Sequence, residues 1–63
     1  MAFSENLKQM REKKGLSQQE LADKLCISQP MVAQFERGSR SPSITVLKEI
    51  AGIFDISVNK LID

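Results

Sequence analysis

Two amide side chains, Gln29 and Gln34, fall on one face of a segment that is expected to be a short helix, residues 27–38. At about 100° per residue, Pro30 and Ala33 lie on the same face, which carries no charge at its N-terminal end. A glutamine amide can form two hydrogen bonds with adenine, through N6 and N7, and a small apolar side chain can contact a thymine methyl group. This face is therefore suited to base-pair edges in a DNA major groove, although glutamines taken alone are more often simply solvated.

Two arginines, Arg37 and Arg40, follow this face in a short polar segment. Because they cluster beside the expected helix, they are expected to bind phosphate oxygens, a contact that holds a protein on DNA whatever the sequence. The alternative is that both are ordinary surface charges.

The composition narrows the classes of function. The 63 residues are expected to form one domain, residues 1–63, with a formal net charge of +1. One Cys and no His exclude an internal disulfide and leave no ligand set for zinc, so we expect no metal and no cofactor. With no His, no Gly-rich phosphate loop and no nucleophile beside a base, the chain is not expected to be an enzyme. No apolar run has the length of a signal peptide or a membrane span, so a cytoplasmic location is expected.

Helix signals run through the chain and strand signals are weak, which predicts an all-α fold of five short helices. The first is expected over residues 4–14, ended by Gly15, and Gly38 is expected to end the third. Serines suited to N-capping precede the other four helices: Ser17, Ser28, Ser43 and Ser57. The inner face of the fourth helix is expected to consist of Ile44, Leu47, Ile50, Ala51 and Phe54.

The second and third helices are separated by only a few residues, around Cys26 and Ile27. Two capped helices joined by so tight a turn have the layout of a helix-turn-helix, here about residues 17–37. In such a motif the second helix presents its outer residues to the major groove. Gln29 and Gln34 lie on that helix.

Three stretches carry a family resemblance: "LSQQELADKL", "FERGSRSPS" and "LKEIAGIFDISVNKL". With the rest of residues 7–62 they resemble the Cro/phage-repressor type of helix-turn-helix domain, the XRE-like family. The resemblance implies a compact five-helix bundle of the lambda-repressor-like type that binds double-stranded DNA. Members usually act as homodimers on palindromic operators, so the implied function is that of a transcriptional regulator, most often a repressor.

The resemblance also implies roles for single residues. Base contacts are implied for Gln29, Pro30 and Gln34, to which the face described above adds Ala33. DNA backbone contacts are expected for Ser17, Gln18, Arg37, Ser39 and Arg40. Ala22 stands where the family needs a small residue for a close helix crossing.

Relatives pair an Arg and a Glu at the positions of Arg11 and Glu36. Each of these residues lies at the border of the apolar arc of its helix. A partly buried ion pair is therefore expected to tie the first helix to the end of the third. Desolvation opposes such a pair, so its net contribution is small, whereas the loss of one partner alone is costly.

The chain departs from the family at two turns, where Cys26 and Asp55 replace the common Gly. If both turns require a positive φ, Cys26 is strained where Gly would not be, while Asp tolerates this left-handed backbone conformation better. Cys26 is expected to be a small buried hydrophobe, with a redox switch as the alternative. Pro30 is unusual at a reading position, because it cannot hydrogen-bond a base.

The C-terminal segment, residues 54–63, carries more apolar side chains than so short a helix can bury. Leu61 matches the family's core leucine, while Val58 and Ile62, four residues apart, are expected to meet a second copy. An isologous dimer would set the two third helices about 34 Å apart, which predicts an inverted repeat with half-sites about 10 base pairs apart. The alternative is that these residues only cover the core.

The main alternative function is a protein-interaction module, such as an antitoxin whose main partner is another protein. The two functions overlap, because antitoxins of this type often bind DNA as well. Operator binding by the isolated chain would separate a DNA reader from a pure scaffold.

Overall fold

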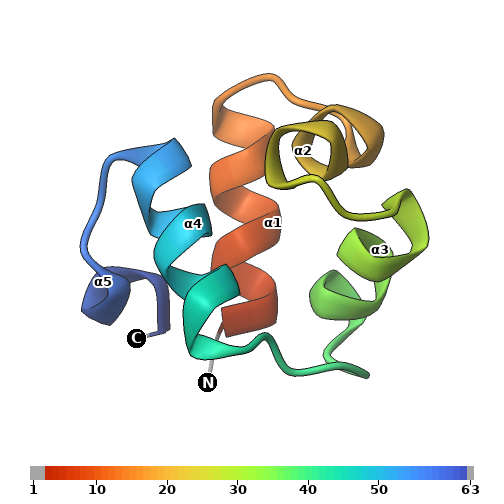
Figure 1. Ribbon diagram of the computed structural model, residues 1–63. Helices are drawn as coiled ribbons and strands as arrows, with labels where there is room; N and C mark the ends of the chain where they lie inside the picture. The colour runs from red at the N-terminus through yellow and green to blue at the C-terminus, as the bar shows by residue number, and fades with distance from the viewer. Residues whose placement is uncertain (1–2, 63) are drawn as a thin grey trace.

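The computed structural model describes residues 3–62, and this part of the chain contains five α-helices. They are α1 (Phe3–Lys13), α2 (Gln18–Leu25), α3 (Gln29–Arg37), α4 (Ile44–Phe54) and α5 (Val58–Ile62). In the view of Figure 1, helix α1 lies between α2 and α3 on one side and α4 and α5 on the other. The predicted all-α fold of five helices is confirmed, and α1 begins and ends one residue earlier than expected.

The four helices after α1 begin at the serines that the sequence indicates. At Ser17 the hydroxyl Oγ accepts the N–H of Glu20 at 3.0 Å, and Glu20 Oε1 accepts the N–H of Ser17 at 2.7 Å, which completes a capping box. The other three serines accept backbone N–H groups in the same way, at 3.3, 3.2 and 3.2 Å: Ser28, Ser43 and Ser57. Each cap contributes about 1 kcal/mol to stability.

Helices α2 and α4 end in left-handed residues that are not glycine. The φ angles are 60° at Cys26 and 57° at Asp55, so both turns do require a positive φ. The N–H group of each residue still closes the last turn of its helix, on carbonyls of Ala22 and Asp23 for Cys26. The geometry of a glycine stop is therefore kept, at the cost of a Cβ in the left-handed region.

The prediction that Cys26 is buried is wrong, because its side chain is exposed. The left-handed residue closes α2 and turns the chain, so the next residue, Ile27, packs against the core in its place. Because its side chain is exposed, Cys26 is not part of the packed core.

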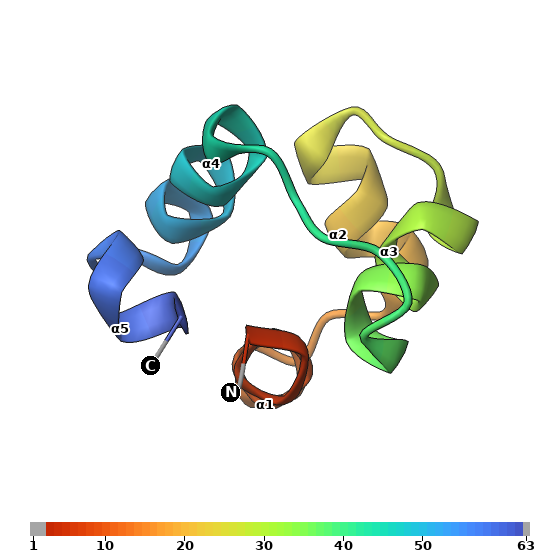
Figure 2. The same ribbon diagram turned by 90° about the horizontal axis from the view of Figure 1, so that it is seen from below.

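A single core receives at least one fully buried side chain from every helix. These residues are Leu7, Leu21, Val32, Phe35, Ile50 and Leu61. The ring of Phe3 meets that of Phe35 edge-on, with centroids 6.2 Å apart. Seen from below, the five helices surround this common centre (Figure 2).

The expected inner face of α4 is wrong at one residue. Ile50, Ala51 and Phe54 are buried and Leu47 is half-buried, but Ile44 is 61% exposed. Ile44 is the first residue of α4, where the helix extends beyond the neighbours that could cover it. The apolar positions of α4 therefore extend one helical turn beyond the part of the helix that packs against the core.

Candidate nucleic-acid interface

Helices α2 and α3 form the expected helix-turn-helix, joined by residues 26–28. Ala22 on α2 has no exposed surface, so the two helices cross closely at this small side chain. Val32 and Phe35 anchor α3 in the core from the other side of the turn. The outer face of α3 is consequently held in a fixed orientation relative to the rest of the molecule (Figure 1).

The four predicted base-contact residues all reach the surface of α3. Pro30 is exposed, while Gln29, Ala33 and Gln34 are half-exposed. The Gln34 side chain makes no hydrogen bond with any residue in the range 3–62, so its amide is free to bind a ligand. Pro30 lies in the first turn of α3, where its missing N–H removes no helical hydrogen bond.

An ion pair ties α1 to the end of α3, as expected for Arg11 and Glu36. Arg11 Nε donates to Glu36 Oε2 at 2.6 Å and Nη2 donates to Oε1 at 3.1 Å, so the contact is bidentate. Nη1 of the same guanidinium donates to the carbonyl of Leu16 at 2.7 Å. The side chains of Arg11 and Glu36 are only 11% and 4% exposed.

The ion pair shifts the pKa values of both partners. The hydrogen bonds that Arg11 donates to Glu36 raise the pKa of Arg11 above its ordinary value, although burial acts in the opposite direction. Burial acts to raise the pKa of Glu36, but hydrogen bonds from Arg11 and Gln18 outweigh it and leave that pKa below its ordinary value. Both groups are therefore charged in the folded protein at neutral pH.

Two glutamines extend the ion pair toward the outer face of α3. Gln18 Nε2 donates to Glu36 Oε1 at 3.0 Å, and Gln29 Nε2 donates to Gln18 Oε1 at 2.7 Å. The four side chains, which we call the Arg11–Gln29 chain, are Arg11, Glu36, Gln18 and Gln29. The Arg11–Glu36 pair was predicted, but the two bonds of Gln18 were not, because residues 18 and 11 positions apart carry no local signal that they touch.

The Arg11–Gln29 chain orients Gln29 without using up its amide. One N–H of Nε2 is bound to Gln18, while the second N–H and Oε1 remain available. A bidentate contact with adenine needs one donor and one acceptor, which Gln29 still offers. Gln18, predicted to contact a phosphate, uses one N–H and its Oε1 in these bonds and keeps a second N–H available.

The other residues predicted to contact the DNA backbone lie at the two ends of the motif. Ser17 is exposed at the start of α2, and its hydroxyl accepts the capping hydrogen bond while keeping its own O–H free to donate. Arg37, Ser39 and Arg40 are exposed at and after the end of α3, where Ser39 Oγ donates to the carbonyl of Gln34 at 3.3 Å. In the part of the chain that the structure describes, neither arginine forms an ion pair.

The two residues predicted to meet a second copy differ in exposure. Val58 is half-buried, while Ile62 is 38% exposed. Between them Leu61 is fully buried, and its carbonyl accepts a hydrogen bond from Asn6 Nδ2 at 2.9 Å. Helix α5 is thus attached to α1 by its inner face and leaves Ile62 outside.

Residues 3–62 contain no group of three or more side chains placed to hold a metal ion. Over the same residues, no helix combines the length and the apolar character that crossing a membrane requires.

Residues 7–61 match the model of a helix-turn-helix family, HTH_3. YqaE of Bacillus subtilis, an uncharacterized HTH-type transcriptional regulator, is 47% identical over 60 residues, which cover 95% of this chain and 52% of YqaE. The HTH-type transcriptional regulator SinR of the same organism is 35% identical over 62 residues, which cover 97% of this chain and 56% of SinR. The chain therefore spans about half the length of these relatives.

A solved structure of SinR, described as the master regulator for biofilm formation in complex with DNA, matches with a TM-score of 0.89. The two chains are 33% identical, and the match covers 98% of this chain and all of the SinR chain in that structure. These relatives are named as transcriptional regulators and not as enzymes, in agreement with the expectation for this chain. The fold, the family model and the relatives agree, and the chain belongs to the HTH_3 family of helix-turn-helix domains, the XRE or Cro/C1 type.

Proposed function

We propose that this chain is the DNA-binding domain of a transcriptional regulator and that it reads duplex DNA with the outer face of α3. The proposal rests on two side chains of that face. The amide of Gln34 makes no hydrogen bond with the described residues, and Gln29 is oriented by its hydrogen bond to Gln18. A side chain that is already oriented loses less conformational entropy when it binds a base. The SinR structure in complex with DNA supports the same use of the fold.

We further propose that residues at the two ends of the motif bind the phosphates that flank the groove. These residues are Ser17 and Gln18 at one end and Arg37, Ser39 and Arg40 at the other. Both arginines are exposed, Arg37 as the last residue of α3 and Arg40 three residues further on. Because the net charge is only +1, binding to unrelated DNA should be weak, and affinity should depend on the bases that α3 contacts. Gln18 Nε2 keeps a second N–H that can donate to a phosphate while both bonds of the Arg11–Gln29 chain stay in place.

A dimer on a palindromic operator completes the proposal. One recognition helix reads too few base pairs for a useful specificity ratio, so two copies are needed. Ile62, with Val58 beside it, provides a small apolar surface on α5 for a weak isologous contact. A dimer bound to an operator in a promoter would block transcription, which makes a repressor the proposed role.

Selection of bound sites from a pool of random duplexes tests this function. The 63-residue chain should enrich an inverted repeat with half-sites centred about 10 base pairs apart. On that site, Arg37→Ala and Arg40→Ala should each lower the slope of log affinity against log salt by about one unit. If no sequence is enriched, DNA reading is wrong, and a protein-interaction module becomes the better account.

A further inference from the structure

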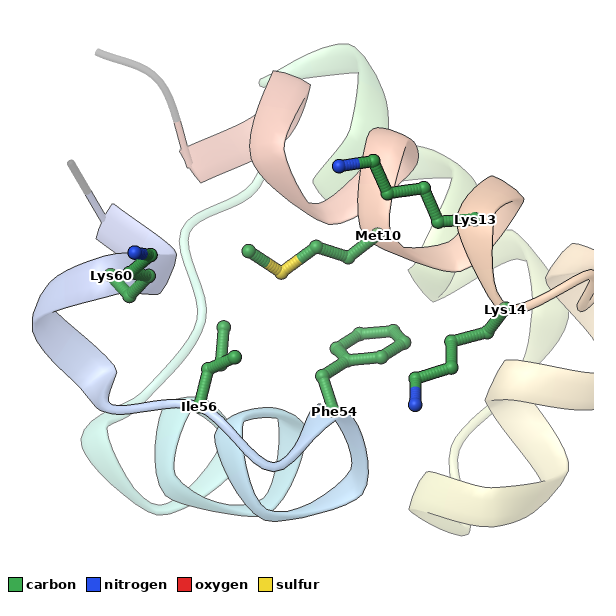
Figure 3. A pocket seen from close by; sticks show the side chains of 6 residues that line it. All are labelled: Met10, Lys13, Lys14, Phe54, Ile56 and Lys60. Carbon is green, nitrogen blue, oxygen red and sulfur yellow. The ribbon is translucent and has the colours of Figure 1, made fainter.

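A pocket of about 280 Å³ opens between α1, α4 and α5. It is lined by Met10, Lys13, Lys14, Phe54, Ile56 and Lys60, and no residue of α2 or α3 takes part (Figure 3). The pocket is therefore separate from the helix-turn-helix surface.

The pocket combines an apolar floor with a cationic rim. Phe54 is buried, and Met10 and Ile56 are half-buried, so the floor is attached to the core. Figure 3 shows Lys60 at one end of these three side chains and Lys13 and Lys14 at the other. In the described residues, none of the three ammonium groups forms an ion pair.

We propose that this pocket binds a small organic anion with an apolar body, such as a medium-chain or aromatic carboxylate. Its volume lies near the lower end of the range for small-molecule pockets, about 300–1,000 Å³. Such a ligand would bury its apolar body against Met10, Phe54 and Ile56 and keep its carboxylate at the lysine rim. Lys13 and Lys60 each lie in the last turn of a helix, where the helix dipole favours a cation, and both of these turns border the same pocket.

Larger occupants fit this surface less well. A second copy bound through the same pocket would bring three lysines against the same three lysines, which is unfavourable. A stable protein interface takes about 800 Å² from each partner, roughly a fifth of the 3920 Å² surface of this domain. A floor of three side chains provides the centre of a small-molecule site rather than an interface of that size.

Methyl NMR spectra of the 63-residue chain test the proposal with three probes. Octanoate should shift the methyl signals of Met10 and Ile56 in a saturable way, because it carries both an apolar chain and a carboxylate. Octyltrimethylammonium, with the same chain and the opposite charge, and acetate, with the head group alone, should bind at least about fivefold more weakly. Equal binding of the two octyl probes, or no saturable shift with octanoate, would overturn the proposal.

A matched pair of triple variants locates the site. Lys13→Gln/Lys14→Gln/Lys60→Gln should weaken octanoate binding about five- to tenfold, since three exposed charges each contribute modestly. The control replaces the other three lysines, which are all exposed, and so removes the same total charge: Lys8→Gln, Lys24→Gln and Lys48→Gln. The control triple should bind octanoate as the unsubstituted chain does. An equal loss in both triples would mean that net charge alone attracts the anion, and the proposed site would be wrong.

Discussion

The two sides of the molecule, on either flank of α1, hold their helices by different means. On the α2–α3 side, the Arg11–Gln29 chain links three helices through hydrogen bonds between side chains. On the α4–α5 side, apolar packing dominates, and in the described residues one side-chain hydrogen bond joins the helices, from Asn6 Nδ2 to the carbonyl of Leu61. The strength of a hydrogen bond depends on the angle at which donor and acceptor meet, whereas the strength of an apolar contact does not.

This difference corresponds to the two tasks that we propose for the molecule. A surface that discriminates bases needs side chains at fixed positions and angles, which directional bonds provide. A surface that pairs two copies weakly needs only exposed apolar area, which Ile62 provides. Four predictions test whether the two sides differ in this way, in order of decreasing size.

Glu36→Ala should lower the free energy of unfolding by about 3 kcal/mol, because it leaves the nearly buried Arg11 without its carboxylate. A domain of this length has only about 3–9 kcal/mol in total, so urea denaturation should show the change clearly. Glu49→Ala on α4, an exposed position, should change stability by less than about 0.5 kcal/mol. A double-mutant cycle with Arg11→Ala completes the test, and additive effects would show that the two residues do not interact.

The same ion pair should make the fold sensitive to acid. The pKa of Glu36 is lower in the folded chain than in the unfolded chain, so its contribution is fully present above the unfolded value of about 4.3. That contribution is lost as the pH falls through the lower, folded pKa. Between pH 7 and pH 3, the unsubstituted chain should therefore lose more stability than Glu36→Gln does. Parallel stability curves for the two chains would remove Glu36 as a source of the acid sensitivity.

On the α4–α5 side, Ile62→Asp should reduce cooperative filling of a two-half-site operator about tenfold or more, because it places like charges at the proposed contact between copies. Affinity for a single half-site and the helical circular-dichroism signal should stay unchanged. Asn59→Asp, on the same helix and with the same change of charge, is the control. If Ile62→Asp keeps its cooperativity, the copies meet elsewhere.

The smallest effects should come from the two left-handed turns, one on each side of the molecule. Cys26→Gly should stabilise the fold by about 1 kcal/mol by removing the strain of a Cβ at a φ of 60°. Asp55→Gly should gain less, because Asp adopts this conformation more readily. Thermal unfolding of both variants gives the ranking, and a larger gain at Asp55 would contradict it.

The sequence was sufficient to predict the features whose causes are local. A serine that caps a helix, such as Ser17, acts on residues three positions away, so its pattern is visible in the chain itself. The positions of the turns at Cys26 and Asp55 were visible because relatives have Gly there, while the positive φ at each remained a condition until the structure showed it. Boundaries and turns were therefore predicted almost to the residue.

The features that the sequence could not predict depend on what lies beside a residue in space. The apolar stripe of α4 includes Ile44, but whether a neighbour covers it depends on where the other helices end. The burial of Cys26 was wrong for the same reason, since its residue type favours burial while its place in the turn exposes it. The bonds that Gln18 makes with Glu36 and Gln29 join α2 to α3, and residue types alone did not indicate them.

The most direct test of the central claim is the effect of Gln34→Ala on sequence discrimination. Affinities would be measured for the selected operator and for versions of it changed at one base pair at a time. We expect Gln34→Ala to cost about 1–3 kcal/mol on the selected operator and to lose discrimination at one base pair. Gln9→Ala, the same change at an exposed position on α1, should leave both unchanged. If Gln34→Ala and Gln29→Ala bind the operator and its altered versions as the unsubstituted chain does, the outer face of α3 does not read DNA.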